Sequence, residues 1–219
     1  MKIIGRIYTE FPDKFGLPRQ SGLAPIRGRI VFDPPYNSPD AFRGIERFSH
    51  IWLLWRFDGF EGAFSPTVRP PRLGGNARVG VFATRSPNRP NPIGMSVLRL
   101  VQVEYTDEGV VLAVEGVDMM SGTAVYDVKP YLAYADSVPS AEGGFAVEHL
   151  DDNLTVGFAA GVQLSADDTE LLKKVLSLDP RPHYHEDGRV YGMRWRDCEV
   201  RFVVEDKILH VLSVEKVVQ

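Results

Sequence analysis

The stretch MSVLRLVQVEYTDEGVVLAVEGVDMMSGTAVYDV, from Met95 to Val128, decides the fold of this chain. Apolar runs at 95–105, 110–117 and 124–128 are separated by the turn-forming segments 107–109 and 119–123. Apolar runs that are divided by short turns rich in Gly, Asp and Ser are typical of antiparallel hairpins. This stretch therefore predicts consecutive antiparallel strands.

The residues upstream extend the same pattern. Strands are predicted at 3–8, 29–32, 50–57 and 79–84, and the nearly continuous apolar run at 50–57 predicts a buried strand. A short helix is expected at 39–48, with Ser38 as its cap and Pro39 at its first position. Many short strands with one short helix predict a mainly β fold, either a barrel or a sandwich.

A smaller α+β module is predicted at 154–219, after a first domain at 1–135 and an acidic linker at 136–153. Its helix is expected to be capped by Ser165, and its buried stripe comprises Leu171, Leu172, Val175 and Leu176. Strands are expected at 154–158, 189–195, 199–205 and 208–214.

Composition narrows the possible classes of protein. The 219 residues carry a net charge of −4, but residues 1–135 carry 16 Lys and Arg against 13 Asp and Glu, a net of +3. The remaining residues carry 9 against 16, a net of −7, so basic character is local to the first domain. The single cysteine excludes an internal disulfide, and the chain has neither a membrane-length apolar run nor a signal-peptide pattern. We therefore expect a cytoplasmic protein.

Motifs of common enzyme classes are missing. No G-x-G-x-x-G, G-x-x-x-x-G-K-[ST] or G-x-S-x-G occurs, which argues against Rossmann, P-loop and serine-hydrolase chemistry. His183 and His185 have no third strong ligand nearby, so no metal site is expected. His50 and Cys198 lie in strand patterns and are interpreted as core residues, His50 with a hydrogen-bond partner.

Residues 69–99 contain six arginines and neither an acidic residue nor a lysine. Arginine binds carboxylates and phosphates through a planar fork of donors, and the prolines and glycines here favour turns over a long helix. The segment is either a binding surface or a polar loop whose arginines pair with acids elsewhere.

Two carboxylates stand at the ends of consecutive predicted strands. Asp118 and Asp127 flank the turn at 119–123, and Lys129 and Tyr131 follow closely. An acid, an amine and a phenol in one pocket can move a proton or orient a nucleophile. The alternative is that both aspartates only cap turns.

Several blocks resemble one family. PTVRPPRLGGNARVGVFATRSPNRPNPIGMS (66–96) is similar to the signature of the TsaA/TrmO (YaeB-like) family, which are tRNA N6-threonylcarbamoyladenosine methyltransferases. The segments at 18–20, 35–52, 127–132 and 179–184 resemble further blocks. The resemblance implies a single-sheeted β-barrel that binds S-adenosylmethionine. It also implies a homodimer that acts on the tRNA anticodon loop carrying threonylcarbamoyladenosine.

The resemblance also implies roles for particular residues. The expected cofactor-binding residues are Pro18, Arg19, Gln20, Asp58, Gly59, Arg85, Gly116, Val117 and Asp118. At Asp58 and Gly59 many members carry other side chains, so the expected contact there is through the backbone. The expected catalytic residues are Asp127 or Asp118 as base or orienter, with Tyr131 and Lys129 shaping the pocket. The expected substrate-binding residues are Arg72, Asn76, Arg78, Arg89 and Asn91.

Other functions fit the same residues. A methyltransferase with another acceptor would keep the cofactor site, and a regulatory RNA-binding module would bind S-adenosylmethionine without turnover. A structural barrel without a small ligand would show no thermal shift with S-adenosylmethionine.

Overall fold

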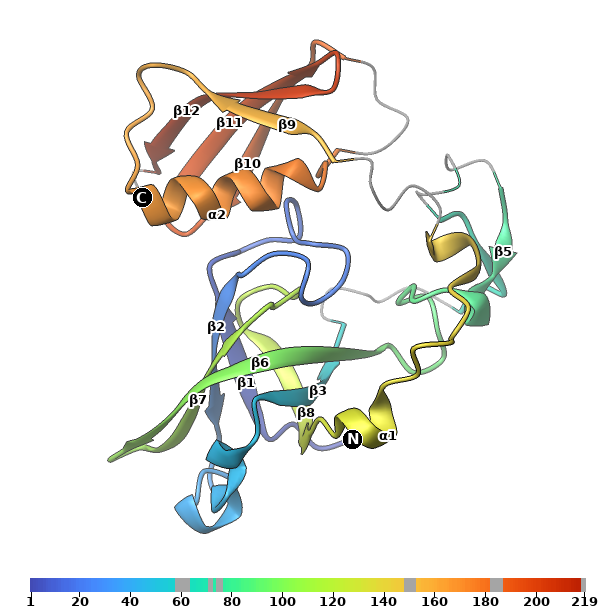
Figure 1. The fold of residues 1–219 in the computed structure, drawn as a ribbon. Helices are drawn as coiled ribbons and strands as arrows, with labels where there is room; N and C mark the ends of the chain where they lie inside the picture. The colour runs from blue at the N-terminus through green and yellow to red at the C-terminus, as the bar shows by residue number, and fades with distance from the viewer. Residues whose placement is uncertain (58–63, 71–72, 74–76, 148–152, 182–186, 218–219) are drawn as a thin grey trace.

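Six antiparallel strands close into a barrel in the first part of the chain (Figure 1). The structure is a computed structural model, and it describes all residues except 58–63, 71–72, 74–76, 148–152, 182–186 and 218–219. The barrel strands are β1 Gly5–Thr9, β2 Arg27–Phe32, β3 His50–Arg56, β6 Ile93–Thr106, β7 Gly109–Glu115 and β8 Thr123–Pro130. Their order around the barrel is β1-β2-β7-β6-β3-β8, which confirms the single-sheeted barrel.

The barrel core follows from the period-2 alternation of strand side chains. Inward-facing residues such as Ile7, Ile51, Leu53, Leu98 and Leu112 are completely buried. The run at 50–57 does form a strand, but the prediction of a buried strand is only partly right. Its residues alternate between buried and half-buried, because the wall of a barrel has an outer face as well as an inner one.

Two other local predictions need correction. The helix expected at 39–48 forms two short 3-10 turns, Pro39–Phe42 and Ile45–Arg47, separated by Gly44 with φ of 92°. Ser38 makes no capping hydrogen bond through its side chain. The strand expected at 79–84 is confined to β5 Val79–Gly80, which pairs with β4 Thr67–Val68, and a 3-10 turn follows at Val81–Ala83.

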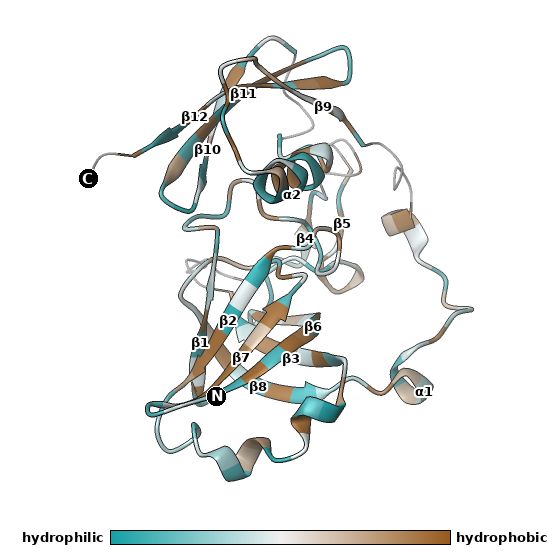
Figure 2. Cartoon of the chain, turned by 60° about the vertical axis from the view of Figure 1, so that its left-hand side comes forward, coloured by the Kyte–Doolittle hydropathy of each residue, from teal (hydrophilic) through white to brown (hydrophobic). Residues whose placement is uncertain are grey.

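The C-terminal part is a four-stranded sheet with one helix, as predicted. The strands are β9 Thr155–Phe158, β10 Val190–Trp195, β11 Cys198–Glu205 and β12 Ile208–Lys216, in the order β10-β11-β12-β9. Helix α2 (Ala166–Ser177) buries Leu172, Val175 and Leu176, and the Ser165 side chain accepts a hydrogen bond from the Asp168 amide at 3.1 Å. Figure 2 shows α2 between this sheet and the barrel.

Short elements lie between the two units. Helix α1 (Ala133–Asp136) follows β8, and a 3-10 turn lies at Gly144–Val147 (Figure 1). The described residues contain no helix that is long and apolar enough to cross a membrane. The linker boundaries at 136 and 153 stay a prediction.

Candidate active site at one end of the barrel

A cavity of about 290 Å³ opens at the end of the barrel where β3 and β7 finish and where β6 and β8 begin. Segments that are distant in the sequence contribute to its wall. The lining residues are Arg19, Gln20, Trp55, Phe57, Thr84, Arg85, Arg89, Ile93, Gly94, Met95 and Asp118. The structure therefore brings together predicted site residues from three separate motifs.

Asp118 is held by a short chain of hydrogen bonds. The Ser96 hydroxyl donates to Oδ1 of Asp118 at 2.6 Å, and Nε1 of Trp55 donates to Oγ of Ser96 at 3.0 Å. Ser96 and Trp55 are 1% and 6% exposed, so both polar groups depend on these partners. This chain fixes one carboxylate oxygen of Asp118 at the cavity wall.

Gly94 makes that arrangement possible. It pairs with Trp55 across β6 and β3, and a Cβ atom at Gly94 would lie 2.1 Å from Cε2 of the Trp55 ring. Only a residue without a side chain lets the indole ring lie against this strand. The glycine therefore places the Trp55 ring so that Nε1 can reach Ser96.

The surroundings of Asp118 shift the pKa of its carboxyl group. Burial raises the pKa of the Asp118 carboxyl above its ordinary value of 3.8. The hydrogen bond from Ser96, backbone hydrogen bonds from Asp118 itself and Ser21, and the charge of Arg85 all act in the opposite direction. A carboxyl with a raised pKa is suited to binding or accepting a proton, and such groups concentrate at functional sites.

Three arginines, Arg19, Arg85 and Arg89, also line the cavity. Nη1 of Arg85 donates to Oε1 of Gln20, so the central arginine and the early turn, both predicted to bind the cofactor, are in direct contact. Arg89 donates from Nη1 to the carbonyls of Val81 and Thr84 at 3.1 and 2.6 Å. Arg89 thus braces the 3-10 turn beside the cavity as well as lining it.

Three other predicted cofactor-binding residues, Pro18, Gly116 and Val117, lie in the segments that carry the lining residues but do not line the cavity themselves. Pro18 and Val117 are buried, and the Gly116 carbonyl accepts a hydrogen bond from the Gly22 amide at 2.9 Å. These contacts tie the early turn to the segment that carries Asp118. Asp58 and Gly59 lie outside the described residues.

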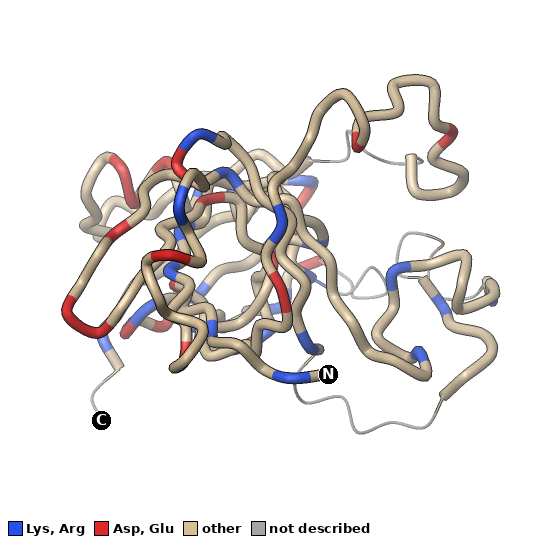
Figure 3. Tube along the Cα trace, turned by 90° about the horizontal axis from the view of Figure 1, so that it is seen from below, with Lys and Arg blue, Asp and Glu red and all other residues tan. Residues whose placement is uncertain are grey.

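The predicted substrate-binding residues are spread along the arginine segment. Arg78 donates from Nη1 to the Thr67 hydroxyl at 2.7 Å, across the β4–β5 hairpin, and Asn91 is exposed. Arg72 and Asn76 lie outside the described residues. Residues 69–99 contain no Asp or Glu, so the arginines of this segment have no acidic neighbour within it; Figure 3 shows the Lys and Arg positions of the described chain in blue and the acidic ones in red.

Asp127 lies elsewhere. On β8 it stands directly opposite Leu54, whereas Val125 stands opposite the inward-facing Trp55, because Tyr126 is the extra residue of a β-bulge. The bulge moves Asp127 to the outer face of the wall, where Nζ of Lys129 lies 2.9 Å from Oδ2 of Asp127. Asp127 and Asp118 therefore do not line the same cavity.

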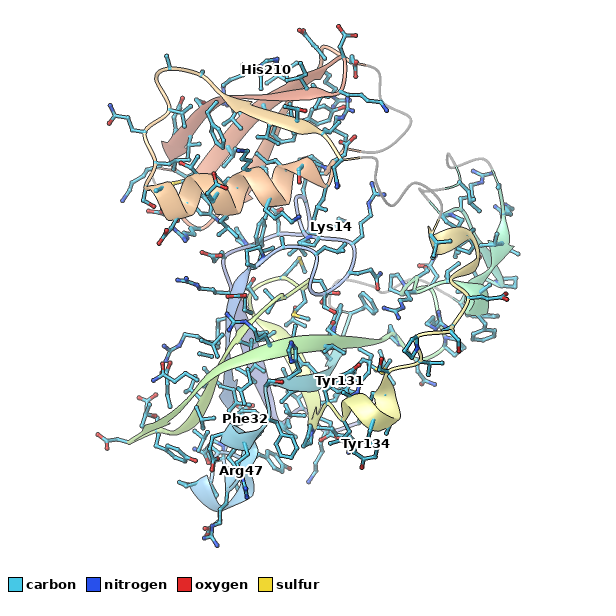
Figure 4. The ribbon with its side chains drawn as sticks, in the orientation of Figure 1. Lys14, Phe32, Arg47, Tyr131, Tyr134 and His210 are labelled. Atoms are coloured by element: carbon cyan, nitrogen blue, oxygen red, sulfur yellow. The ribbon has the colours of Figure 1, made fainter. Side chains whose placement is uncertain are left out.

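Tyr131 belongs to this outer face. Its ring centroid lies 5.8 Å from that of Trp52, which stands opposite Lys129, and Nε1 of Trp52 donates to Asp136 in α1 at 3.0 Å. Figure 4 shows Tyr131 beside α1. The predicted group of an acid, an amine and a phenol is thus found together, but on the wall and not in the cavity.

Ser96 and Trp55 were missed as site residues by the sequence analysis. The available signal was Ser96 itself, because period-2 alternation in β6 places it on the core face with Leu98. A polar residue on a core face needs a buried partner, and here the partners are Trp55 and Asp118.

Three further predictions concern side chains outside the cavity. His50 and Cys198 are half-buried, so the core interpretation is only partly right, although His50 Nδ1 does lie 2.9 Å from the Ser49 hydroxyl. His183 and His185 lie outside the described residues. Within the described residues, no three His, Cys, Asp or Glu side chains are grouped as for a metal ion.

Comparisons with known proteins agree with this geometry. Residues 6–137 match the family described as the tRNA-methyltransferase O N-terminal domain, and residues 154–217 match the TrmO C-terminal domain. The chain belongs to the tRNA-methyltransferase O family. The expected family is therefore confirmed over the barrel and the C-terminal unit.

Relatives in the family cover nearly the whole chain. A tRNA (adenine(37)-N6)-methyltransferase of Escherichia coli is 42% identical over 225 residues, which span 97% of this chain and 96% of the relative. A Pseudomonas aeruginosa protein whose name places it among S-adenosylmethionine-dependent methyltransferases is 42% identical over 211 residues, 91% of this chain and 90% of the relative. The crystal structure of TrmO from Pseudomonas aeruginosa aligns with a TM-score of 0.78 at 35% identity and covers 97% of each chain.

Proposed function

We propose that this chain uses S-adenosylmethionine to methylate N6 of adenine 37 in tRNA, with threonylcarbamoyladenosine as the acceptor nucleoside. The observation that carries the proposal is the cavity itself. It is lined by the half-buried carboxylate of Asp118 and by Arg19 and Arg85, in a member of the tRNA-methyltransferase O family.

The side chains present fit S-adenosylmethionine. The carboxylate of Asp118 suits a cationic or hydroxyl-bearing part of this molecule, and Arg19 and Arg85 suit the carboxylate of its methionine end. Trp55 and Phe57, whose ring centroids are 4.3 Å apart, offer an apolar wall for its adenine. When bound, S-adenosylmethionine supplies an electrophilic methyl group. We assign its binding to residues 18–20, 58–59, 85 and 116–118.

Asp118 is the preferred base in this proposal. The N6 lone pair of the acceptor is delocalised into the adenine ring and the carbamoyl group, so removal of the N6 proton makes it a better nucleophile. Oδ2 of Asp118 carries no hydrogen bond from Ser96 and is the oxygen assigned to that proton. Asp127, with Lys129 and Tyr131, would act on the acceptor only if the acceptor approached along the outer wall.

The arginine segment is proposed to hold the tRNA. Arg72, Arg78 and Arg89, with Asn76 and Asn91, would contact the phosphates and sugars of the anticodon loop. Contacts of this kind make affinity fall with salt, whereas selectivity comes from the modified base in the cavity.

This chain is also proposed to form a homodimer and to act in the cytoplasm. Large apolar side chains are exposed close to the cavity: Met95 is 53% exposed, and Phe82 on the adjacent 3-10 turn is 71% exposed. A second copy of the chain would cover such side chains. The cytoplasmic location follows from the tRNA substrate.

Calorimetry with S-adenosylmethionine tests the cofactor site directly. Wild-type protein is expected to bind, and Arg85→Ala is expected to bind at least tenfold more weakly because a charge-assisted contact is lost. Arg201→Ala, on the exposed side of β11, is the control that should leave affinity unchanged. No binding by the wild type would contradict the proposed function.

Turnover is then measured by nucleoside mass spectrometry on tRNA with and without the threonylcarbamoyl group. Methylation of the modified tRNA alone supports the stated acceptor. Methylation of both tRNAs would indicate a different acceptor, and binding without methylation would indicate a cofactor-sensing module.

A further inference from the structure

The loop at residues 10–20, here called the coupling loop, joins β1 to the turn that lines the cavity. On the barrel side, its Phe11 side chain is completely buried. The Phe11 carbonyl also accepts a hydrogen bond from the Ser121 amide at 2.8 Å, three residues beyond Asp118. One side of the loop is therefore attached to the segment that carries Asp118.

The C-terminal sheet packs against the middle of the coupling loop. The ring of Phe15 stacks with those of Tyr191 and Phe202, with centroid distances of 6.2 and 6.4 Å. Gly16 approaches so closely that a Cβ atom there would lie 2.0 Å from Sδ of Met193. Figure 4 shows Lys14, at the tip of this loop, directly beneath α2.

Arg196 binds the start of the loop. This residue, in the turn between β10 and β11, donates from Nε to Oε1 of Glu10 at 2.8 Å, and its amide donates to the Glu10 carbonyl at 2.6 Å. Its Nη1 also pairs with Asp168 of α2 at 2.9 Å. Among the described residues, Oε2 of Glu10 is buried and has no hydrogen-bond partner, so the Glu10 charge depends on Arg196.

The end of the loop contacts the C-terminal unit as well. Nη2 of Arg19, a cavity-lining residue, donates to the Asp179 carbonyl at 3.4 Å. Asp179 is itself fixed by Arg181, whose Nε lies 2.9 Å from Oδ1 of Asp179. The C-terminal unit thus contacts the coupling loop at its start, its middle and its end.

We propose that the C-terminal unit is a positioning element for the cofactor cavity, and that Arg196 is its principal positioning residue. The proposal rests on the proposed function, because it assigns the turn at 18–20 to S-adenosylmethionine. A loop without strand partners has many conformations, and contacts that hold it in one of them reduce the entropy lost when a ligand binds. Over residues 154–219 the unit carries 9 Lys and Arg against 11 Asp and Glu, a net of −2, so it offers no excess of positive charge to tRNA, and we assign its contacts to the loop.

The test compares full-length variants by calorimetry and steady-state kinetics. Arg196→Ala is expected to raise the Kd and KM for S-adenosylmethionine about tenfold, with kcat at saturating cofactor and KM for tRNA changed by less than about twofold. Arg196→Lys, which keeps the charge, should recover part of the affinity. The control is His210→Ala, since His210 is exposed on the part of the sheet away from the barrel (Figure 4).

A second variant separates positioning from loss of folding. Adding Glu10→Gln to Arg196→Ala removes the unpaired buried carboxylate, so the double variant should bind S-adenosylmethionine no more weakly than the single one. A Kd in folded Arg196→Ala equal to that of the wild type would overturn the inference. A raised KM for tRNA with an unchanged KM for S-adenosylmethionine would also overturn it. Absence of binding by the wild type would instead refute the proposed function on which the inference rests.

Discussion

Asp118 and Asp127 follow the same sequence pattern but lie in opposite environments. Asp118 is half-buried, lines a cavity and accepts a 2.6 Å hydrogen bond from Ser96. The Asp127 side chain is 41% exposed on the outer wall and pairs with Lys129, whose side chain is 64% exposed. Burial shifts the pKa of Asp118 upward, whereas the pair at Asp127 is screened by water.

Asp118 follows the end of β7, but Asp127 lies inside β8, so the prediction that it ends a strand is wrong. The difference teaches that the surroundings of a carboxylate, and not its place in the sequence pattern, decide its chemistry. Both residues are within ten positions of each other along the chain and flank one turn. A single bulge residue, Tyr126, decides that Asp127 faces outward. Variants of these two aspartates and of their neighbours distinguish catalysis in the cavity from catalysis at the outer wall.

The largest effect is expected for Asp118→Asn. Loss of a general base typically costs a factor of about 10² to 10⁴, so the rate of tRNA methylation should fall by at least about 100-fold at neutral pH. Initial rates with saturating S-adenosylmethionine measure this. A variant that keeps more than a tenth of the wild-type rate would show that Asp118 is not the base.

Gly94→Ala should disrupt the cavity through packing. The added Cβ would overlap the Trp55 ring and displace it from Ser96, at a cost of about 1–3 kcal/mol in the free energy of unfolding. Urea denaturation measures the loss. The matched control is Gly161→Ala, where the added Cβ has no atom within 4 Å; equal stability of the two variants would contradict the packing argument.

Ser96→Ala should change the pH dependence of the methylation rate more than it changes the maximal rate. The Ser96 hydroxyl stabilises the Asp118 carboxylate, so its loss raises the pKa of Asp118 further. Because the base works deprotonated, the acid-side midpoint of the rate profile should move to higher pH, with less than about a tenfold loss at the plateau. An unshifted midpoint would show that Asp118 does not control the rate.

The smallest effect is expected for Asp127→Asn. An exposed ion pair contributes about 0–1 kcal/mol, so the free energy of unfolding should fall by no more than about 1 kcal/mol. The methylation rate should stay within about threefold of the wild-type rate. Rates measured beside those of Asp118→Asn make the comparison direct. A loss as large as that of Asp118→Asn would assign the chemistry to the outer wall.

Much of the architecture is predictable from local patterns. Apolar runs divided by turn-forming segments predicted all six barrel strands, and Ser165 with its following stripe predicted α2. The failures occurred where chain geometry changes within a few residues, as at Gly44, which divides the expected helix, and after Gly80, where a strand becomes a 3-10 turn. Local propensity is a weak guide at such points because tertiary packing decides the outcome.

By itself, the sequence determined the family, the strands, and the turn and arginine motifs that meet at the cavity, since these depend on near neighbours and side-chain chemistry. Only the tertiary structure decided that Asp118 faces the cavity, that Trp55 and Ser96 hold it, and that Arg196 reaches Glu10. The reason is physical: desolvation, strand register and contacts between units depend on residues far apart in the chain.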